Sequence, residues 1–295
     1  NSNKTLIVYY RIDVPGGFNK QIGLKQTLDL RLELFFDTSD FLNFRIQYYN
    51  SLKNSRLRVH FQTGLHETVT HADGHFCLEE RTLNKRVSDT DYSPRKSSYP
   101  GELDYPTNFM GDFVFMSGAS HNVCIAARGL HEYEVLSDEK GSQIALTLHR
   151  AVGALSVDGG GIRSCHAGPG LSTPDAQCLR ELVHNVGITI STEDKFRILS
   201  RARSYSHPPL VVEMPRLPFV KNRATIDARG SLLKLMNKTV ELSSFRYCPK
   251  QKVTIARLYN SSTQKELCDI VIHEKFKSCM ESDLFEKWQQ DKASE

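Results

Sequence analysis

The residues best suited to chemistry form the segment from Asp158 to Arg163, which reads DGGGIR. Its consecutive glycines expose backbone N–H groups that can cradle an anion, and an arginine lies beside them. A phosphate-binding loop would end in Gly-Lys-Ser or Gly-Lys-Thr and continue into a helix, and neither feature follows here. Glycine clusters also serve backbone geometry alone, so the segment indicates either a structural turn or a loop that faces a substrate.

The same segment resembles the oxyanion loop of patatin-like phospholipases, which would make the chain an acyl hydrolase. Such an enzyme also needs a Gly-x-Ser-x-Gly nucleophile elbow on a strand-to-helix turn. No segment of this sequence has that spacing. An acyl hydrolase is therefore disfavoured.

Two histidines, His71 and His75, have the His-x-x-x-His spacing that can bind zinc when both side chains project from one face of a helix. Gly74 and the strand-like segments on either side argue against a helix at this point. The sequence predicts a polar turn between two strands and no metal site in this chain.

Carboxylates are plentiful, and Glu132 and Glu134 lie two residues apart on an expected strand, so they share a face. A glycosidase needs two carboxyl groups that flank one sugar bond, but separation along the sequence does not show which two converge. Charged side chains are mostly exposed, which favours a solvated strand face for this pair.

The bulk composition describes a globular protein of one large or two ordinary domains, with 295 residues and 39% apolar side chains. The net charge of +4 is spread along the chain, which gives no case for nucleic acid or a membrane as a partner. The seven cysteines are scattered and never spaced as Cys-x-x-Cys, so we expect reduced, mostly buried thiols in a cytoplasmic protein. The sequence leaves the oligomeric state open, a homodimer included.

Alternating apolar and polar residues dominate the first two thirds of the chain. Leucines at 28, 30, 32 and 34 alternate with charged residues, which predicts a half-buried antiparallel strand, and the segments 44–48, 57–61 and 144–148 repeat the pattern. One helix is expected, capped by Ser191 or Thr192, with Phe196, Leu199 and Ala202 at helical spacing, and ended by 206–209.

Short strand-like runs at 240–247, 252–259 and 267–273 follow a proline-containing segment at 215–218. They predict a second, smaller β-sandwich. The expected domains are a large β domain over 1–218 and a small one over 219–295.

Several strings, weak individually, occur together in the order found in the carboxy-terminal region of glycoside hydrolase family 38, which this chain resembles over nearly its whole length. They are RLRVHF at 56–61, ADGHF at 72–76, GLHEYEV at 129–135, IALTLHRAVG at 144–153, AGP at 167–169, PDAQC at 174–178 and IARLYN at 255–260.

The resemblance implies an all-β fold, a large antiparallel β-supersandwich of the galactose-mutarotase type followed by a small β-sandwich. It also implies that the full enzyme is a zinc-dependent, retaining α-mannosidase acting on α-mannosides or mannose-containing oligosaccharides. An upstream βα barrel would carry the zinc and the aspartate nucleophile, so we expect more chain before Asn1, and no catalytic or metal-binding residue here. The barrel's own signature, His-x-Asp followed closely by Trp, is missing from this sequence.

The resemblance further implies that the glycine-rich loop reaches the barrel's active site, with Arg163 contacting the bound sugar and Asp158 orienting it. A guanidinium group suits that task because its fixed fork of donors can span two hydroxyls. A different class of function remains open, a stand-alone carbohydrate-binding β-sandwich. Such modules stack aromatic platforms on sugars, and Trp288, the single tryptophan, is poorly placed for that.

Overall fold

The computed structural model describes residues 4–14, 26–83, 106–156, 168–212 and 229–287. The chain divides into two compact units, Asn1–Leu210 and Val211–Glu295. The first unit contains β1 (Thr5–Val14), β2 (Gln26–Phe36), β3 (Leu42–Tyr49), β4 (Arg56–Gln62), β5 (Val69–Asp73), β6 (Leu78–Thr82), β7 (Thr107–Phe109), β8 (Phe113–Ser117), β9 (Asn122–Ala127), β10 (Glu132–Asp138), β11 (Gly141–Arg150), η1 (Pro174–Gln177), β12 (Glu181–Ser191) and α1 (Lys195–Ser206).

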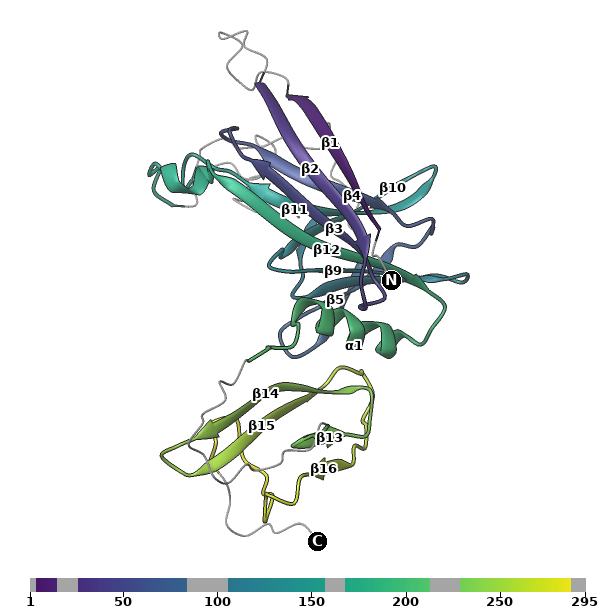
Figure 1. Ribbon diagram of the computed structural model, residues 1–295, viewed down its shortest axis with the longest axis vertical. Helices are drawn as coiled ribbons and strands as arrows, with labels where there is room; N and C mark the ends of the chain where they lie inside the picture. Colours follow the sequence, from purple (N-terminus) through teal and green to yellow (C-terminus); the bar gives the residue numbers. More distant parts are fainter. Residues whose placement is uncertain (1–3, 15–25, 84–105, 157–167, 213–228, 288–295) are drawn as a thin grey trace, which may run out of the picture. The chain divides into compact units, whose positions relative to one another are not determined.

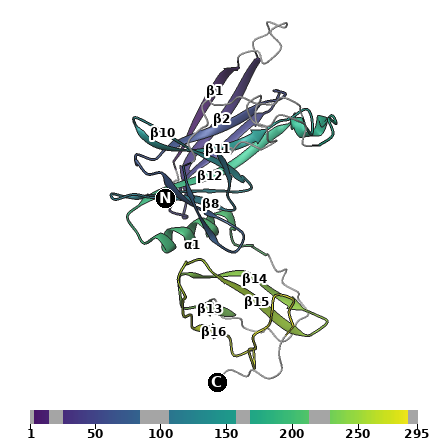
Figure 2. The ribbon, with the colours of Figure 1, turned by 180° about the vertical axis from the view of Figure 1, so that it is seen from behind.

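Two antiparallel sheets build this unit (Figure 1 and, from behind, Figure 2). The larger has the order β1-β2-β3-β12-β9-β8-β5-β6, and the smaller has the order β4-β11-β10-β7. The all-β prediction is confirmed, and the predicted strands at 28–34, 44–48, 57–61 and 144–148 are β2, β3, β4 and β11.

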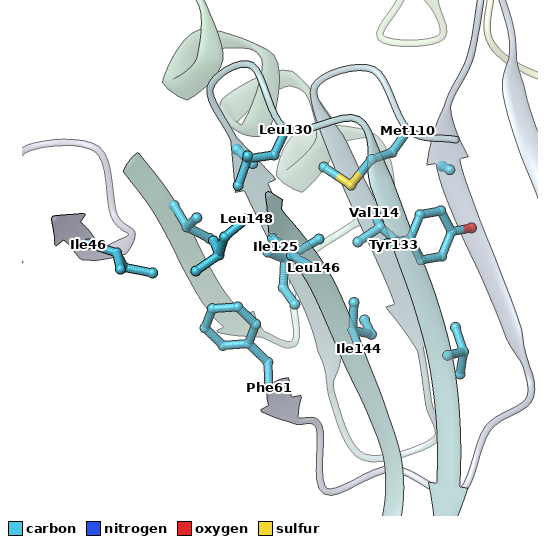
Figure 3. Packing of buried hydrophobic residues seen from close by; sticks show 14 of the residues in the cluster. Ile46, Phe61, Met110, Val114, Ile125, Leu130, Tyr133, Ile144, Leu146 and Leu148 are labelled. Atoms are coloured by element: carbon cyan, nitrogen blue, oxygen red, sulfur yellow. The ribbon is translucent and has the colours of Figure 1, made fainter. Parts of the chain in front are cut away.

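The main core lies between the two sheets (Figure 3). Ile144 and Leu146 of β11 face it from the small sheet, and Val114 and Ile125 face it from the large sheet, all with no exposed surface. Tyr133 is equally buried, and its hydroxyl hydrogen-bonds to the Thr70 hydroxyl at 3.0 Å, which removes the cost of burying a phenol unpaired.

A second core lies on the other face of the large sheet, under helix α1. Phe113 and Phe115 of β8 meet Leu199 and Tyr205 of the helix. Both faces of β8 and β9 are therefore covered, so these strands are continuous apolar runs without alternation. Gly187 of β12 permits the close approach, because a Cβ there would lie 2.8 Å from the Tyr205 ring.

The predicted helix is confirmed, but its predicted cap is wrong. Asp194, rather than Ser191 or Thr192, is the N-cap, and its carboxylate accepts a hydrogen bond from the Arg197 backbone N–H at 3.3 Å. Ser191 serves a tight turn just before it, where its hydroxyl accepts from the Glu193 N–H. The helix ends at Ser206, where the sequence predicted.

The second unit contains four short strands in its described part, β13 (Leu233–Leu235), β14 (Val240–Cys248), β15 (Val253–Asn260) and β16 (Ile270–Ile272). They form two antiparallel pairs, β13 with β16 and β14 with β15. The predicted boundary at 218/219 falls among residues 213–228, outside the described residues, so its position stays a prediction.

The expectation of mostly buried thiols is wrong for the cysteines that the structure describes. All six are free, but only Cys124 is fully buried, and Cys279 is exposed. Burial raises the pKa of the Cys124 thiol, which makes it unreactive. No helix among the described residues is long and apolar enough to cross a membrane.

Candidate functional site

Four of the strings that carry the family resemblance meet around the outer face of the small sheet. RLRVHF is β4, IALTLHR is most of β11, GLHEYEV leads into β10, and ADGHF ends β5 and begins the turn that follows. Because β4 and β10 flank β11, polar residues at alternate positions on all three strands come together on the side opposite the core.

Glu132 is the centre of the polar network on this face. One of its carboxylate oxygens lies 2.7 Å from Arg56 Nη2 and accepts from the Thr147 hydroxyl at 2.7 Å, while the other lies 3.3 Å from Arg150 Nη1. Both oxygens are thus occupied by the protein's own donors. Glu132 is built into the sheet face and is poorly placed to protonate a glycosidic oxygen.

Glu134 forms an ion pair with Arg58 on the same face, and its side chain is only 2% exposed. The expectation of a solvated strand face is therefore wrong for Glu134. The two carboxylates share one face, as their i, i+2 spacing predicts, but Arg58 of β4 pairs with Glu134 and leaves its side chain almost without access to water. Glu132 and Glu134 are both held in ion pairs with arginines, which fixes the structure of this face. Neither carboxyl group is available as the acid or base that a glycosidase requires.

A ladder of three stacked rings continues this face at the edge of the sheet. The Phe109 ring lies 5.2 Å from the His75 ring at an interplanar angle of 11°, and 5.8 Å from the His131 ring at 21°. His131 donates its Nδ1–H to the Met110 carbonyl at 3.1 Å, so its other ring nitrogen is the acceptor of the neutral form. Phe109 remains 38% exposed, which leaves an aromatic surface available to a partner.

Phe76, next to His75 in the turn, has a positive φ of 63° and is 56% exposed. Glycine or asparagine usually fills such left-handed positions, because a bulky side chain is strained there. Phe76 thus adds an exposed aromatic side chain to the turn that carries His75.

Asp158 and Arg163 lie outside the described residues, and so does the whole segment 157–167. The base from which that segment departs is described. An isolated bridge joins Ala154 to Ser172, and the Leu155 N–H donates to the Leu171 carbonyl at 2.8 Å. This base follows directly on Arg150, which is one of the partners of Glu132.

An amide pair formed by the buried Gln177 and the exposed Asn54 holds the base in place. The Gln177 amide donates to Asn54 Oδ1 at 2.8 Å and accepts from the Asn54 backbone N–H at 2.7 Å. Gly153 packs directly on this pair, since a Cβ there would lie 2.6 Å from Gln177 Nε2. One further string of the resemblance, PDAQC at 174–178, thus meets the end of IALTLHRAVG, residues 151–153.

His71 and His75 do not converge, because each ring has partners of its own. His71 Nε2 lies 3.5 Å from Glu80, and its ring packs edge-on against Phe115, whereas His75 stacks on Phe109. The predicted polar turn between two strands is confirmed for His75, whereas His71 lies within β5. No group of three or more His, Cys, Asp or Glu side chains suited to a metal occurs in the described part of the chain, so zinc finds no fitting ligand set there.

Beneath the loop base lies a buried cluster that the sequence did not predict, formed by Tyr48, His149 and His184. The Tyr48 hydroxyl lies 2.8 Å from His149 Nδ1 and 3.3 Å from His184 Nε2. His149 Nε2 lies 3.1 Å from the Ser55 hydroxyl, which itself donates to the Leu52 carbonyl. Proton counting then gives one arrangement: His149 carries its proton on Nε2, Tyr48 donates to His149, and His184 donates to Tyr48.

This cluster predicts a loss of stability in acid. Burial, reinforced by the neighbouring His149, lowers the pKa of His184 from 6.5 to about 4. Between these values the unfolded chain binds a proton that the folded chain does not, so stability falls as the pH drops below 6.5. For a partly solvated ring we expect a loss of about 1–2 kcal/mol at pH 5. Urea unfolding at pH 7.5 and 5.0 should show that the free energy of unfolding falls less in His184→Gln than in the unaltered chain. Equal falls in the two proteins would mean that the His184 ring does not cause the acid sensitivity.

The comparisons with known proteins agree with this fold. No protein-family model matches the sequence. No curated protein matches it either. An α-mannosidase from Enterococcus faecalis V583 shares the fold with a TM-score of 0.70 at 20% identity, over 92% of this chain and 30% of its own. A protein of glycosyl hydrolase family 38 from Enterococcus faecalis gives 0.69 at 19%, over 92% and 32%.

The chain thus spans about a third of the length of these two proteins. At this level of identity the likeness establishes a common fold. The fold of this chain is therefore that of one part of two larger proteins, which are described as an α-mannosidase and a member of glycosyl hydrolase family 38.

Proposed function

We propose that residues 1–295 are the carboxy-terminal, non-catalytic portion of a zinc-dependent, retaining α-mannosidase of glycoside hydrolase family 38. The observation that carries the proposal is the extent of the shared fold, 92% of this chain against 30% of an α-mannosidase. The chemistry belongs to a catalytic barrel that contributes the zinc ligands and the nucleophile. The substrate is an α-mannoside or a mannose-containing oligosaccharide.

The task of this portion is to support the barrel and to line part of the sugar site. The outer face of the small sheet suits that task because its charges are mutually paired and rigid, so a partner surface can be met without reorganisation. The ring ladder of His75, Phe109 and His131 adds exposed aromatic area at its edge. Arg163 is proposed to contact the sugar, with Asp158 orienting it. The Asn54–Gln177 pair holds the described residues that flank the segment carrying both.

The protein is proposed to act in the cytoplasm. The described cysteines are free thiols, and several are accessible, a state that a reducing compartment maintains.

An assay of the isolated chain tests whether catalysis and zinc binding belong to the barrel and not to residues 1–295. We expect residues 1–295 to hydrolyse no 4-nitrophenyl α-mannoside and to hold no stoichiometric zinc, because the carboxylates at 132 and 134 are bound to arginines and the two histidines diverge. Elemental analysis and a chromogenic assay measure both. One equivalent of tightly bound zinc, or turnover above a buffer blank, would overturn the proposal and restore His71 and His75 as ligands.

A further inference from the structure

A groove of about 700 Å³ lies on the outer face of the large sheet, the side of the sandwich opposite the polar face of the small sheet. It runs over β1, β2, β3 and the start of β12. Leu28 and Tyr48 face the core and are buried, so the residues next to them along each strand point outward into the groove. The outward side chains are Tyr9, Arg11, Asp29, Arg31, Gln47, Tyr49 and Glu181.

The strand register sets these side chains in rows. Tyr9 pairs with Arg31 and Arg31 with Gln47, while Arg11 pairs with Asp29, and Tyr49 with Glu181. The tyrosines stand at opposite corners, two strands apart and two residues out of step. That offset separates their Cα atoms by about 12 Å, enough for two different rings of one ligand.

Both tyrosines are largely open to solvent, with 74% of Tyr9 and 61% of Tyr49 exposed. Tyr49 is held in place by its hydroxyl, which donates to the Leu179 carbonyl at 3.4 Å. Tyr9 lies directly across from Arg31 in the strand register, so the tyrosine and the guanidinium are neighbours on this face. A tyrosine has only two side-chain torsions, so it loses little conformational freedom when a flat apolar surface stacks on its ring.

The polar groups between the tyrosines already have partners, and Arg31 forms an ion pair with Glu33 of the same strand. Arg11 Nε lies 2.8 Å from Asp29 Oδ1, with a second bond at 3.2 Å, and the Gln47 amide donates to Glu181. Two arginines and the carboxylates of Asp29 and Glu181 line the groove, so its lining residues carry no net charge. A polyanion or an acidic membrane surface finds no electrostatic attraction here.

We propose that this groove binds a neutral carbohydrate chain, with two of its rings stacked on Tyr9 and Tyr49 and its hydroxyls bound by the paired side chains between them. A sugar ring combines an apolar C–H face, which packs on an aromatic ring, with hydroxyls that both donate and accept. An alternation of aromatic platforms and planar polar groups without net charge is complementary to that chemistry. The inference does not depend on mannoside cleavage, because it concerns binding by residues of this chain alone.

Affinity gel electrophoresis of residues 1–295 in gels containing yeast mannan, xylan, β-glucan or dextran tests the proposal without any turnover. We expect at least one of these neutral polysaccharides to retard the chain. Tyr9→Ala and Tyr49→Ala should each weaken that binding by about tenfold, since each removes one stacking platform. Tyr9→Phe and Tyr49→Phe keep the ring and should bind within a few-fold of the unaltered chain.

Tyr247→Ala is the matched control, because Tyr247 is 59% exposed on β14 of the other unit. Melting temperatures within a few degrees of the unaltered chain ensure that the alanine variants are folded. If no polysaccharide retards the chain, or if both alanine variants bind as well as Tyr247→Ala, the groove is no carbohydrate site. Concentration-dependent self-association that is lost in the same variants would assign the face to a second copy of the chain and equally refute the proposal.

Discussion

Glu134→Ala should lower the free energy of unfolding of the first unit by about 3–5 kcal/mol, the usual cost of removing one partner from a buried ion pair. The Arg58 guanidinium, whose side chain is only 19% exposed, would be left without its carboxylate in a poorly solvated place. Urea unfolding followed by circular dichroism measures the change.

The double variant Arg58→Leu/Glu134→Leu separates the buried charge from the packing. Replacing both partners leaves no uncompensated ion, so it should recover most of the loss. Glu132→Ala is the matched single control, because Glu132 is 27% exposed and its arginines keep access to water. If Glu134→Ala costs no more than Glu132→Ala, the pair is no buried ion pair in solution.

Arg163→Ala in the full-length enzyme should reduce kcat/KM for a mannoside on the order of ten- to a hundredfold, which corresponds to about 1.5–3 kcal/mol for a charged hydrogen-bond donor. A contact made equally in the ground and transition states raises KM, and one that tightens in the oxocarbenium-like transition state lowers kcat. Asp158→Ala should give a smaller loss in the same direction, because it acts by orienting the arginine.

Zinc content and melting temperature should be unchanged in the Arg163 variant. Arg197→Ala, which removes an arginine with a 67% exposed side chain on α1, controls for the loss of one positive charge. A value of kcat/KM within twofold of the unaltered enzyme would mean that the loop is a turn and that Arg163 is a surface residue.

Much of the sheet structure was predictable because half-buried strands alternate. In β2, Leu28 and Leu30 pack toward the core while Asp29 and Arg31 face out, and such a period of two is typical of a strand with one buried face. β8 and β9 escaped prediction for the opposite reason. Both of their faces are buried, one by the small sheet and one by α1, so the runs FVFM and VCIAA show no alternation. A continuous apolar run bounded by turns was the available signal.

The site was predictable in its parts but not in its assembly. The sequence shows that Glu132 and Glu134 share a face, but only the pairing of β11 with both β4 and β10 brings Arg56 and Arg58 over them. Likewise, Tyr9 and Tyr49 come together because β2 lies between β1 and β3. A search for a tryptophan platform overlooks them, since two tyrosines on separate strands have no fixed spacing along the chain.

The helix cap shows a local limit of prediction from sequence. Ser191, Thr192 and Asp194 all have side chains that can cap a helix. Which of them does so depends on the residue at which strand β12 ends. The strand continues through Ser191, so the first residue free to turn into the helix is farther along, at Asp194.

The most direct test of the central proposal is a chromogenic assay of the complete gene product that contains residues 1–295, against 4-nitrophenyl α-mannoside and a panel of other 4-nitrophenyl glycosides. We predict hydrolysis of the α-mannoside with retention of anomeric configuration, abolished by a chelator and restored by zinc. Selective hydrolysis of another glycoside would contradict the assignment of this chain to an α-mannosidase, and so would the absence of any hydrolysis.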